Sequence, residues 1–207
     1  MLIPLSKICS KYGIIPNGIL HVGACQMEEL QDYQDLSIKN VIWVEANPRL
    51  VLENKQKAYD SGHILLEGLI YDEDDLEVDF NLTNNLQSSS ILSFGKHSEY
   101  HPHVYVENVI KSKTITLKSL LESNDISLDF FDFVNIDIQG VELRALKGMG
   151  GYLKNVSYVY TEVNIGDVYS GNDTINQIDE YLGSMGFVRV ETEITPYEWG
   201  DAFYMKK

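Results

Sequence analysis

Residues 133–142 read FVNIDIQGVE, and this short stretch points to the class of fold. Its apolar run predicts a buried strand that ends at Asp137, after which Gly140 and a helical pattern follow. Residues 19–25 (ILHVGAC) repeat this succession of strand and glycine turn, and residues 41–45 (VIWVE) form another strand, which ends at Glu45. The pattern predicts one α/β sheet with a polar crevice along the carboxyl ends of its strands, where such sheets bind ligands.

Strands alternate with helices along most of the chain. Further strands are expected at residues 64–70, 77–83, 113–116, 157–163, 187–193 and 201–205, and helices at 27–36, 48–59, 117–123, 142–147 and 173–185. Such alternation implies a parallel sheet with right-handed crossovers and helices on both faces. The last two strands are separated by residues 195–200 (TPYEWG) and can pair as a hairpin, which places one antiparallel strand in the sheet.

Length and composition indicate a single domain over residues 1–207. The chain has 207 residues, of which 44% are hydrophobic, and this is enough for one well-filled core. Residues 84–110 are rich in Asn, Ser, His and Pro, and we interpret them as an insertion that covers the crevice.

The net charge and the N-terminal residues restrict the partners and the location of the protein. A formal net charge of -15 argues against nucleic acid, because binding to it needs a basic stripe. No apolar run approaches the length of a membrane span, and Pro4 and Lys7 interrupt the start of the chain before a signal-peptide core develops. Cys9 and Cys25 are too few for a disulfide framework. We therefore expect a cytoplasmic protein, and the sequence does not predict its oligomeric state.

The glycine turn after the first strand is a candidate nucleotide site. Gly23 allows a ligand to approach the main chain, and the helix start behind it offers free N–H groups. The patterns GxGxxG and GK[ST] are absent, which argues against NAD or ATP. Glu45 follows about twenty residues later, where an acid can hold ribose hydroxyls. The structural alternatives are an ordinary strand-to-helix connection at Gly23 and, for Glu45, an acid near the helix start at Pro48.

Six short motifs carry a resemblance to a known family. They are HVGA at 21–24, WVEANP at 43–48, QSSSIL at 87–92, IDIQGVE at 136–142, YTEVN at 160–164 and WGDA at 199–202. In this order and spacing, the chain from residue 13 to its end resembles the FkbM family of S-adenosylmethionine-dependent methyltransferases. The resemblance implies a Rossmann-like class I methyltransferase fold, with a mostly parallel seven-stranded sheet and one antiparallel strand near the C-terminus. It also implies S-adenosylmethionine as methyl donor and transfer to an oxygen, often a hydroxyl of a sugar or natural product.

The resemblance further implies roles for individual residues. Gly23 and its neighbours would face the methionine part of the cofactor, Glu45 the ribose, the turn at Tyr71 and Asp72 the adenine, and Asp137 the sulfonium. The cofactor-binding candidates are His21, Gly23, Ala24, Glu45, Ala46, Asn47, Tyr71, Asp72, Asp137, Ile138 and Gln139. His21 occupies a position where most class I enzymes have an acid, and Met27 one where many have glycine. His21 is therefore either a cofactor contact or a hydrogen-bonded histidine of the turn.

Methyl transfer to a hydroxyl needs a group that removes the proton. The catalytic candidates are Asp137 and Glu162 at two strand ends, together with His97 and His101, since histidine is the usual base near neutral pH. Asp137, Glu162 and Asn164 also supply oxygen ligands of the kind that Mg²⁺ uses. The alternatives are that Asp137 orients the cofactor while Glu162 and Asn164 bind substrate hydroxyls, and that the histidines belong to a surface loop.

Residues 87–90 are the candidate segment for binding the methyl acceptor. Gln87, Ser88, Ser89 and Ser90 supply one amide and three hydroxyls, although a serine-rich turn is the other interpretation. The sequence thus predicts an O-methyltransferase for a small-molecule or glycan acceptor, most simply a sugar hydroxyl. The competing hypotheses are a cofactor- or glycan-binding subunit without turnover and an NAD-linked oxidoreductase.

Overall fold

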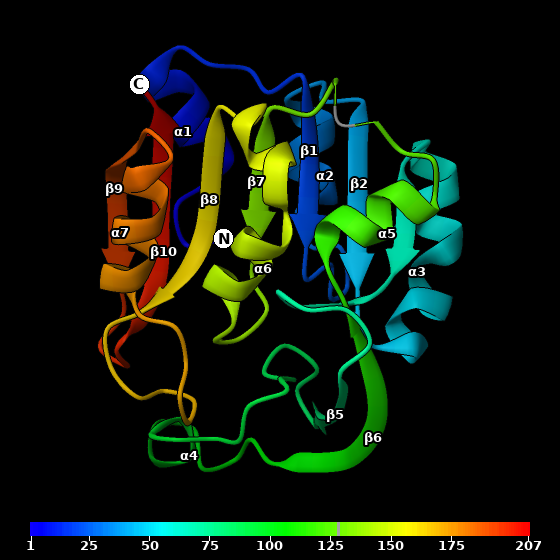
Figure 1. The fold of residues 1–207 in the computed structure, drawn as a ribbon, viewed down its shortest axis with the longest axis vertical. Coiled ribbons are helices and arrows are strands. Elements are labelled where there is room, and N and C mark those ends of the chain that lie inside the picture. Colours follow the sequence, from blue (N-terminus) through cyan, green and yellow to red (C-terminus); the bar gives the residue numbers. More distant parts are fainter. Residues whose placement is uncertain (128) are drawn as a thin grey trace.

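The computed structural model describes residues 1–127 and 129–207. Its main element is a seven-stranded sheet in the order β3-β2-β1-β7-β8-β10-β9 (Figure 1). The strands of this sheet are β1 (Gly18–Val22), β2 (Asn40–Glu45), β3 (Ile64–Glu67), β7 (Phe133–Ile136), β8 (Tyr158–Asn164), β9 (Phe187–Ile194) and β10 (Trp199–Lys206). The helices are α1 (Leu5–Tyr12), α2 (Leu30–Asp35), α3 (Pro48–Ser61), α4 (His97–Tyr100), α5 (Leu117–Ser123), α6 (Glu142–Gly148) and α7 (Ile175–Ser184), with a 3-10 helix at Gly150–Lys154.

The sheet is parallel except at β10. β1 pairs in parallel with β2 and β7, and β7 with β8, whereas β10 is antiparallel to both β8 and β9. The predicted mostly parallel seven-stranded sheet with one reversed strand near the C-terminus is confirmed. The strand order reverses between β1 and β7, so the carboxyl ends of these two strands flank the place where open α/β sheets bind ligands.

Helices cover both faces of the sheet, as the alternating pattern predicts. Leu5 of α1, Tyr33 of α2 and Ala58 of α3 belong to one apolar core cluster. Residues of α5, α6 and α7 belong to the other cluster, on the opposite face. The fully buried strands explain the near-continuous apolar runs in the sequence, because both faces of a doubly covered parallel sheet must be apolar.

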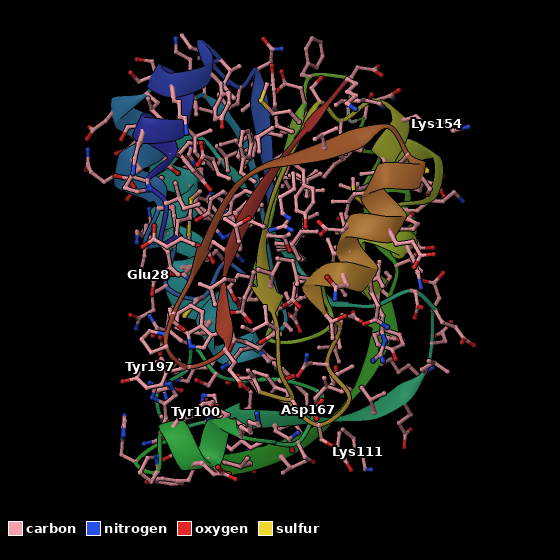
Figure 2. The ribbon with its side chains drawn as sticks, turned by 90° about the vertical axis from the view of Figure 1, so that its left-hand side faces the viewer. Glu28, Tyr100, Lys111, Lys154, Asp167 and Tyr197 are labelled. Atoms are coloured by element: carbon pink, nitrogen blue, oxygen red, sulfur yellow. The ribbon has the colours of Figure 1, made fainter. Side chains whose placement is uncertain are left out.

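A second, three-stranded sheet lies beyond the carboxyl ends of the parallel strands. It has the order β4-β6-β5, with β4 (Leu69–Ile70), β5 (Glu77–Thr83) and β6 (Val106–Ile115). Figure 1 shows β5 and β6 at the end toward which the arrows of β1, β2 and β8 point. Figure 2 shows the same ribbon from the side, with Tyr100 close to Tyr197, whose ring centroids are 5.6 Å apart. The crevice is therefore bounded by the main sheet on one side and by this small sheet on the other.

Three sequence-based boundaries are wrong. The strand expected at 64–70 is divided at Gly68 into β3 and β4, which belong to different sheets. The strand expected at 113–116 is the end of the longer β6, whose first residues lie within the segment interpreted as an insertion. The helix expected from residue 27 begins at Leu30, because Cys25 and Met27 have positive φ angles of 42° and 54°. In the parts of the chain that the structure describes, no helix has the length and apolar character to cross a membrane.

Candidate active site

Two adjoining cavities lie at the carboxyl ends of the parallel strands. The larger has a volume of about 420 Å³ and the smaller about 60 Å³. Five residues line both cavities, namely Gly23, Cys25, Gln87, Asp137 and Gln139. The junction of the two cavities thus coincides with the reversal in strand order between β1 and β7.

The turn after β1 approaches the turn after β7 very closely at Gly23. Gly23 has a φ of 92°, and a Cβ atom built on it would lie 1.8 Å from the main-chain oxygen of Asp137. The N–H groups of Gly23 and Ala24 both donate to the carbonyl oxygen of Val44, at 2.9 and 3.0 Å. The side chain of Ala24 is buried in the core, so only its backbone contributes to the turn. Glycine is needed here because any side chain would separate the two strand ends.

Glu45 brings a buried carboxylate to the smaller cavity. It accepts hydrogen bonds from the N–H groups of Cys25 and Asn47, both at 2.7 Å. Burial raises the pKa of Glu45 to about 7, and the backbone donors oppose this shift. Ala46 also lines the cavity, whereas the side-chain oxygen of Asn47 accepts from the N–H of Arg49 and caps α3. Glu45 is therefore the polar group of this cavity on the β2 side.

The far wall of the smaller cavity is apolar. Leu69, Ile70, Phe80 and Ile138 contribute to it. Tyr71 and Asp72, the sequence-based candidates for this place, line neither cavity. The N–H of Tyr71 donates to Ile115 at 3.1 Å, and its ring lies 5.3 Å from the Arg144 guanidinium carbon. Ile70 is thus the last residue of this segment that lines the cavity, and the chain leaves the cavity before the predicted adenine contacts at Tyr71 and Asp72.

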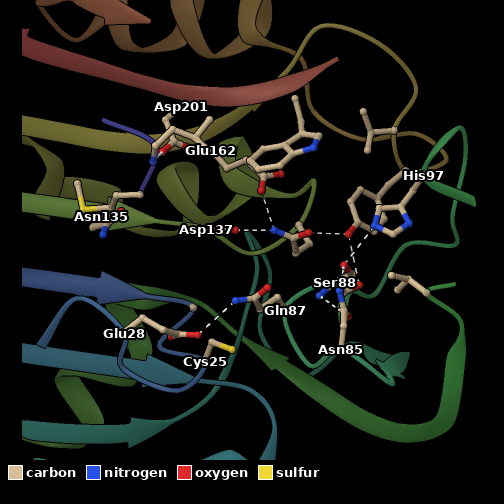
Figure 3. Close-up of a pocket in the computed structure, with 18 of the residues that line it drawn as sticks. Cys25, Glu28, Asn85, Gln87, Ser88, His97, Asn135, Asp137, Glu162 and Asp201 are labelled. Carbon is tan, nitrogen blue, oxygen red and sulfur yellow. Dashed lines mark hydrogen bonds between the residues drawn. The ribbon is translucent and has the colours of Figure 1, made fainter. Parts of the chain in front are cut away.

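At the junction, the side-chain amide of Gln139 lies between two carboxyl groups. Its nitrogen donates to Asp137 and to Glu162, each at 2.6 Å, as Figure 3 shows. Its oxygen accepts from the Tyr169 hydroxyl at 2.6 Å, which fixes the orientation of the amide. Gln139 has a φ of 60°, a strained value for a residue with a side chain. Its backbone oxygen also accepts from the Ser90 hydroxyl at 2.7 Å.

The two carboxyl groups have raised pKa values. Desolvation is the main cause for both, and it raises the pKa of Asp137, whose side chain is exposed at the cavity, to about 6. The pKa of Glu162 lies well above its ordinary value because of burial and of the charge of Asp137. At neutral pH this arrangement favours one ionised and one protonated carboxyl, with the Gln139 amide between them.

Residues 86–91 form a strap that lines the smaller cavity at Leu86, Gln87, Ser89, Ser90 and Ile91. The hydroxyl of Ser89 donates to the carbonyl oxygen of Leu86 at 3.0 Å, and that of Ser90 bonds to Gln139. The Ser88 oxygen accepts from the Asn85 amide at 2.8 Å. Gln87 is exposed and lines both cavities, and its amide lies 3.4 Å from Glu28. The serines thus hold the strap in place, and Gln87 is the member whose side chain is available to a ligand.

The histidines of residues 97–103 all line the larger cavity. His97 is buried, with its Nε2 atom 3.2 Å from the Ser88 hydroxyl and its ring stacked on Phe94 at 4.3 Å. Burial lowers the pKa of His97 to about 4, so its ring is neutral at pH 7. The His101 ring is 5.0 Å from the His97 ring and 4.8 Å from Tyr197. His97 and His101 therefore belong to the wall of a cavity, not to a freely solvated loop.

His21 lies at the inner end of the larger cavity, within β1. Its Nδ1 atom is 2.9 Å from the Tyr33 hydroxyl and 3.3 Å from the Asn135 amide nitrogen, and its ring packs on Trp43 with centroids 4.6 Å apart. Burial lowers its pKa, which keeps the ring neutral. His21 thus has hydrogen-bond partners within a strand and not in a turn, and it also lines the larger cavity.

Residues 21–189 of the chain match a known protein family. The model of the methyltransferase FkbM domain matches residues 21–189. The chain belongs to the FkbM methyltransferase family. Membership, together with the seven-stranded sheet, makes it an S-adenosylmethionine-dependent methyltransferase of the class I fold.

Solved structures show the same fold at low sequence identity. An uncharacterized protein from Listeria monocytogenes serotype 4b has a TM-score of 0.54 at 11% identity, and the alignment covers 98% of this chain and 66% of that one. Ribosomal protein L11 methylase from Lactobacillus delbrueckii subsp. bulgaricus has a TM-score of 0.53 at 13% identity, and the alignment covers 96% of this chain and 74% of that one. Magnesium protoporphyrin IX methyltransferase from Synechocystis PCC 6803, solved with bound SAM, has a TM-score of 0.52 at 12% identity, and the alignment covers 98% of this chain and 76% of that one. No curated protein matches the chain.

This FkbM-family methyltransferase does not present its acidic residues as an open metal site. Among residues 1–127 and 129–207, no group of three or more His, Cys, Asp or Glu could hold a metal ion. The Gln139 amide occupies the space between Asp137 and Glu162. Asn164 lines neither cavity, and its amide nitrogen is 3.4 Å from Glu162. The predicted ligands are thus close together, but they do not fit a cation as they stand.

Several residues that line the larger cavity are not among the candidates that the sequence predicts. Cys25, Glu28, Tyr169, Trp199 and Asp201 all line the larger cavity. They come from turns and from the start of β10, where no periodic pattern marks a residue as facing a cavity. Trp199 and Asp201 do belong to the WGDA motif of the family resemblance, and that motif is the sequence feature that could have identified these two residues.

Proposed function

We propose that this methyltransferase transfers the methyl group of S-adenosylmethionine to a hydroxyl, most simply one of a sugar or glycan. The proposal rests chiefly on the two cavities that meet at Gly23, Asp137 and Gln139. A two-substrate transfer needs a donor site and an acceptor site that share one reacting point. The smaller, partly apolar cavity suits the nucleoside, and the larger polar cavity suits a polyhydroxylated acceptor.

The residues of the smaller cavity fit a nucleoside. Glu45 presents a carboxylate that can accept from ribose hydroxyls, and Ile70, Phe80 and Ile138 offer apolar surface for a base. The cavity volume of about 60 Å³ is below the roughly 300 Å³ of ordinary ligand pockets. The strap at residues 86–91 closes one side of it, so we expect the strap to shift outward when the nucleoside enters. S-adenosylmethionine, when bound, supplies an electrophilic methyl group.

Asp137 is the best placed general base. It lies where the cavities meet, and with a pKa of about 6 it is largely ionised at neutral pH. The Gln139 amide, which also donates to Glu162 of β8, holds Asp137 in place. His97, with a pKa lowered to about 4, is a weaker base and is better suited to positioning the acceptor by hydrogen bonds. His101 lies farther along the same wall and is the second base candidate.

Assistance by Mg²⁺ is the competing version of this mechanism. It would require the Gln139 amide to leave the space between Asp137 and Glu162 so that both carboxylates, with Asn164, could turn to the ion. Exhaustive chelation separates the two versions. Unchanged methylation in excess EDTA supports Asp137 as an unassisted base, and activity that returns only on adding Mg²⁺ supports the metal version.

Calorimetric titration with S-adenosylmethionine and S-adenosylhomocysteine tests the donor site. We expect both to bind, and we expect Glu45→Ala to weaken binding by about 10- to 100-fold, because a buried charged hydrogen bond contributes roughly 1.5–3 kcal/mol. Glu45→Gln guards against a folding defect, since it keeps the shape of the side chain. Glu53→Ala, an exposed position on α3, is the matched control and should bind as the wild type does. Absence of wild-type binding would remove the proposed function.

A further inference from the structure

The larger cavity, called the acceptor cavity below, is unusually acidic. Five carboxyl groups line it, from Glu28, Glu29, Asp137, Glu162 and Asp201. Among the described residues, no Lys or Arg side chain lines it. Glu162 and Asp201 are buried, whereas Glu28 and Asp137 are exposed. Like charges that line a cavity of about 420 Å³ repel one another, and a ligand of opposite charge relieves that repulsion.

The carboxyl groups are distributed around the acceptor cavity and do not form one cluster. Glu28 is exposed at the turn after β1, where it accepts from the Gln26 N–H at 3.1 Å. Asp201 is buried on β10 and accepts from the Tyr160 hydroxyl. Glu29 pairs with the Met1 amino group at 3.1 Å. A cation inside the cavity therefore meets carboxylates from the turn after β1, from Asp137 after β7 and from β10.

The positive charge of the methyl donor does not offset all of these groups. The donor carries a sulfonium, an ammonium and a carboxylate, so its net charge is one positive unit. Asp137 lies nearest the shared edge of the two cavities and is the natural neighbour of the sulfonium. The Met1 amino group also lines the cavity and offsets Glu29, with which it pairs. Glu28 and Asp201 remain on the acceptor side without a Lys or Arg side chain in the cavity to pair with.

His97 is an independent sign of a ligand in the acceptor cavity. It is 5% exposed, it lines the cavity, and its Nδ1 atom has no hydrogen-bond partner among the described residues. Its other ring nitrogen is already occupied by the Ser88 hydroxyl. A buried polar atom without a partner in the protein is costly unless a ligand satisfies it.

Trp199 completes the chemistry of the cavity wall. It lies at the start of β10, opposite Asn164 in the register with β8, and it lines the acceptor cavity together with Tyr169. Aromatic faces attract ammonium groups and also pack against the apolar faces of sugar rings. Carboxylates combined with an aromatic surface are the usual environment for a protonated amine.

We propose that the methyl acceptor carries a protonated amine close to the hydroxyl that is methylated, as an amino sugar does, and that phosphorylated and uronic acid sugars are rejected. This inference rests on the proposed function, because it assigns a substrate class to the same site. The amine pairs with the carboxylates of the β1 turn and β10, and the hydroxyl faces Asp137. An anionic acceptor meets an excess of carboxylates, and the Met1 amino group that lines the cavity is already paired with Glu29.

Three matched probes test the charge preference. Glucosamine, glucose and glucuronic acid have similar size and differ in charge, and each is titrated calorimetrically into protein saturated with S-adenosylhomocysteine. We expect glucosamine to bind at least about tenfold more tightly than glucose, and glucuronic acid not to bind. The same probes incubated with S-adenosylmethionine are then inspected by mass spectrometry for a gain of one methyl group on glucosamine.

Two variants locate the effect. Glu28→Gln removes one carboxylate of the acceptor cavity and should reduce the preference for glucosamine over glucose at least threefold, while Glu107→Gln, an equal charge change on β6 outside the cavity, should not. Suppose that S-adenosylhomocysteine binds but that glucosamine binds no more tightly than glucose, or that glucuronic acid also binds. Either result overturns the charge inference and leaves the proposed function standing. If S-adenosylhomocysteine itself does not bind, the proposed function fails first.

Discussion

Gly23 is the residue on which the approach of the two strand ends depends. A methyl group at this position would overlap the Asp137 carbonyl, and the φ of 92° is strained for any other residue. We predict that Gly23→Ala lowers the free energy of unfolding by about 2–4 kcal/mol, the sum of the strained φ and a forced separation of β1 from β7. Urea unfolding followed by circular dichroism measures the change.

Gly62 provides the matched control for this substitution. It ends α3 with a φ of 72°, and a Cβ atom there would meet nothing within 4 Å. Gly62→Ala should therefore lower the free energy of unfolding only by the cost of the left-handed backbone conformation, about 1 kcal/mol. Equal losses in the two variants would mean that the contact with Asp137 adds nothing to the strain.

The strap at residues 86–91 is attached to the sheet through Gln139. The Tyr169 hydroxyl holds the Gln139 amide from the segment after β8, and Ser90 holds its backbone oxygen. We predict that Tyr169→Phe destabilises the protein by about 1–2 kcal/mol, because the half-buried Gln139 oxygen loses its donor. Hydrogen exchange should also become faster in residues 84–92 than in β1 or β7. Tyr59→Phe, at a 79% exposed position, is the control, and equal exchange in both variants would contradict the attachment.

The elements that could be predicted from sequence are those with a strong pattern. Buried parallel strands such as β1, β2 and β7 show mostly apolar runs, and α3 shows Pro48 at its start. β6 was half missed because residues 106–113 are mostly exposed and show no apolar alternation, and pairing with β5 makes them a strand. Because Cys25 and Met27 have positive φ angles, α2 begins later than the sequence predicts, and the residue types do not indicate these angles.

The candidate site was predictable where side chains sit at strand ends. Glu45, Asp137 and Glu162 lie at or near the carboxyl ends of three strands, and the structure brings them to the two cavities. Tyr71 and Asp72 line neither cavity, because the chain enters a second sheet after Gly68, and this depends on tertiary pairing that the local sequence does not show. Trp199 and Tyr169 reach the cavity only through the reversed strand and a long connection, so pattern alone could not select them.

The protein combines a formal net charge of -15 with several buried carboxyl groups. Burial raises the pKa of Asp137 to about 6, of Glu45 to about 7 and of Glu142 to about 8. Each of these groups binds its proton more tightly in the folded than in the unfolded state. Their contribution to stability is therefore fully present below about pH 4 and is lost as pH rises through 6 to 8, and repulsion among the surface carboxylates acts in the same direction.

Glu142 gives the sharpest test of this pH dependence. It is fully buried at the start of α6, where one carboxyl oxygen accepts from the N–H groups of Ile138 and Gly140 at 3.1 and 2.9 Å. Its other oxygen has no partner among the described residues. We predict that the free energy of unfolding of the wild type falls between pH 5.5 and 8.5, and that Glu142→Gln reduces this fall by on the order of 2 kcal/mol. Urea titrations at the two pH values measure both slopes, with Glu180→Gln on the exposed side of α7 as control. A wild type that becomes more stable toward pH 8.5, or a Glu142 variant with the wild-type slope, would show that this carboxyl is not held protonated by the fold.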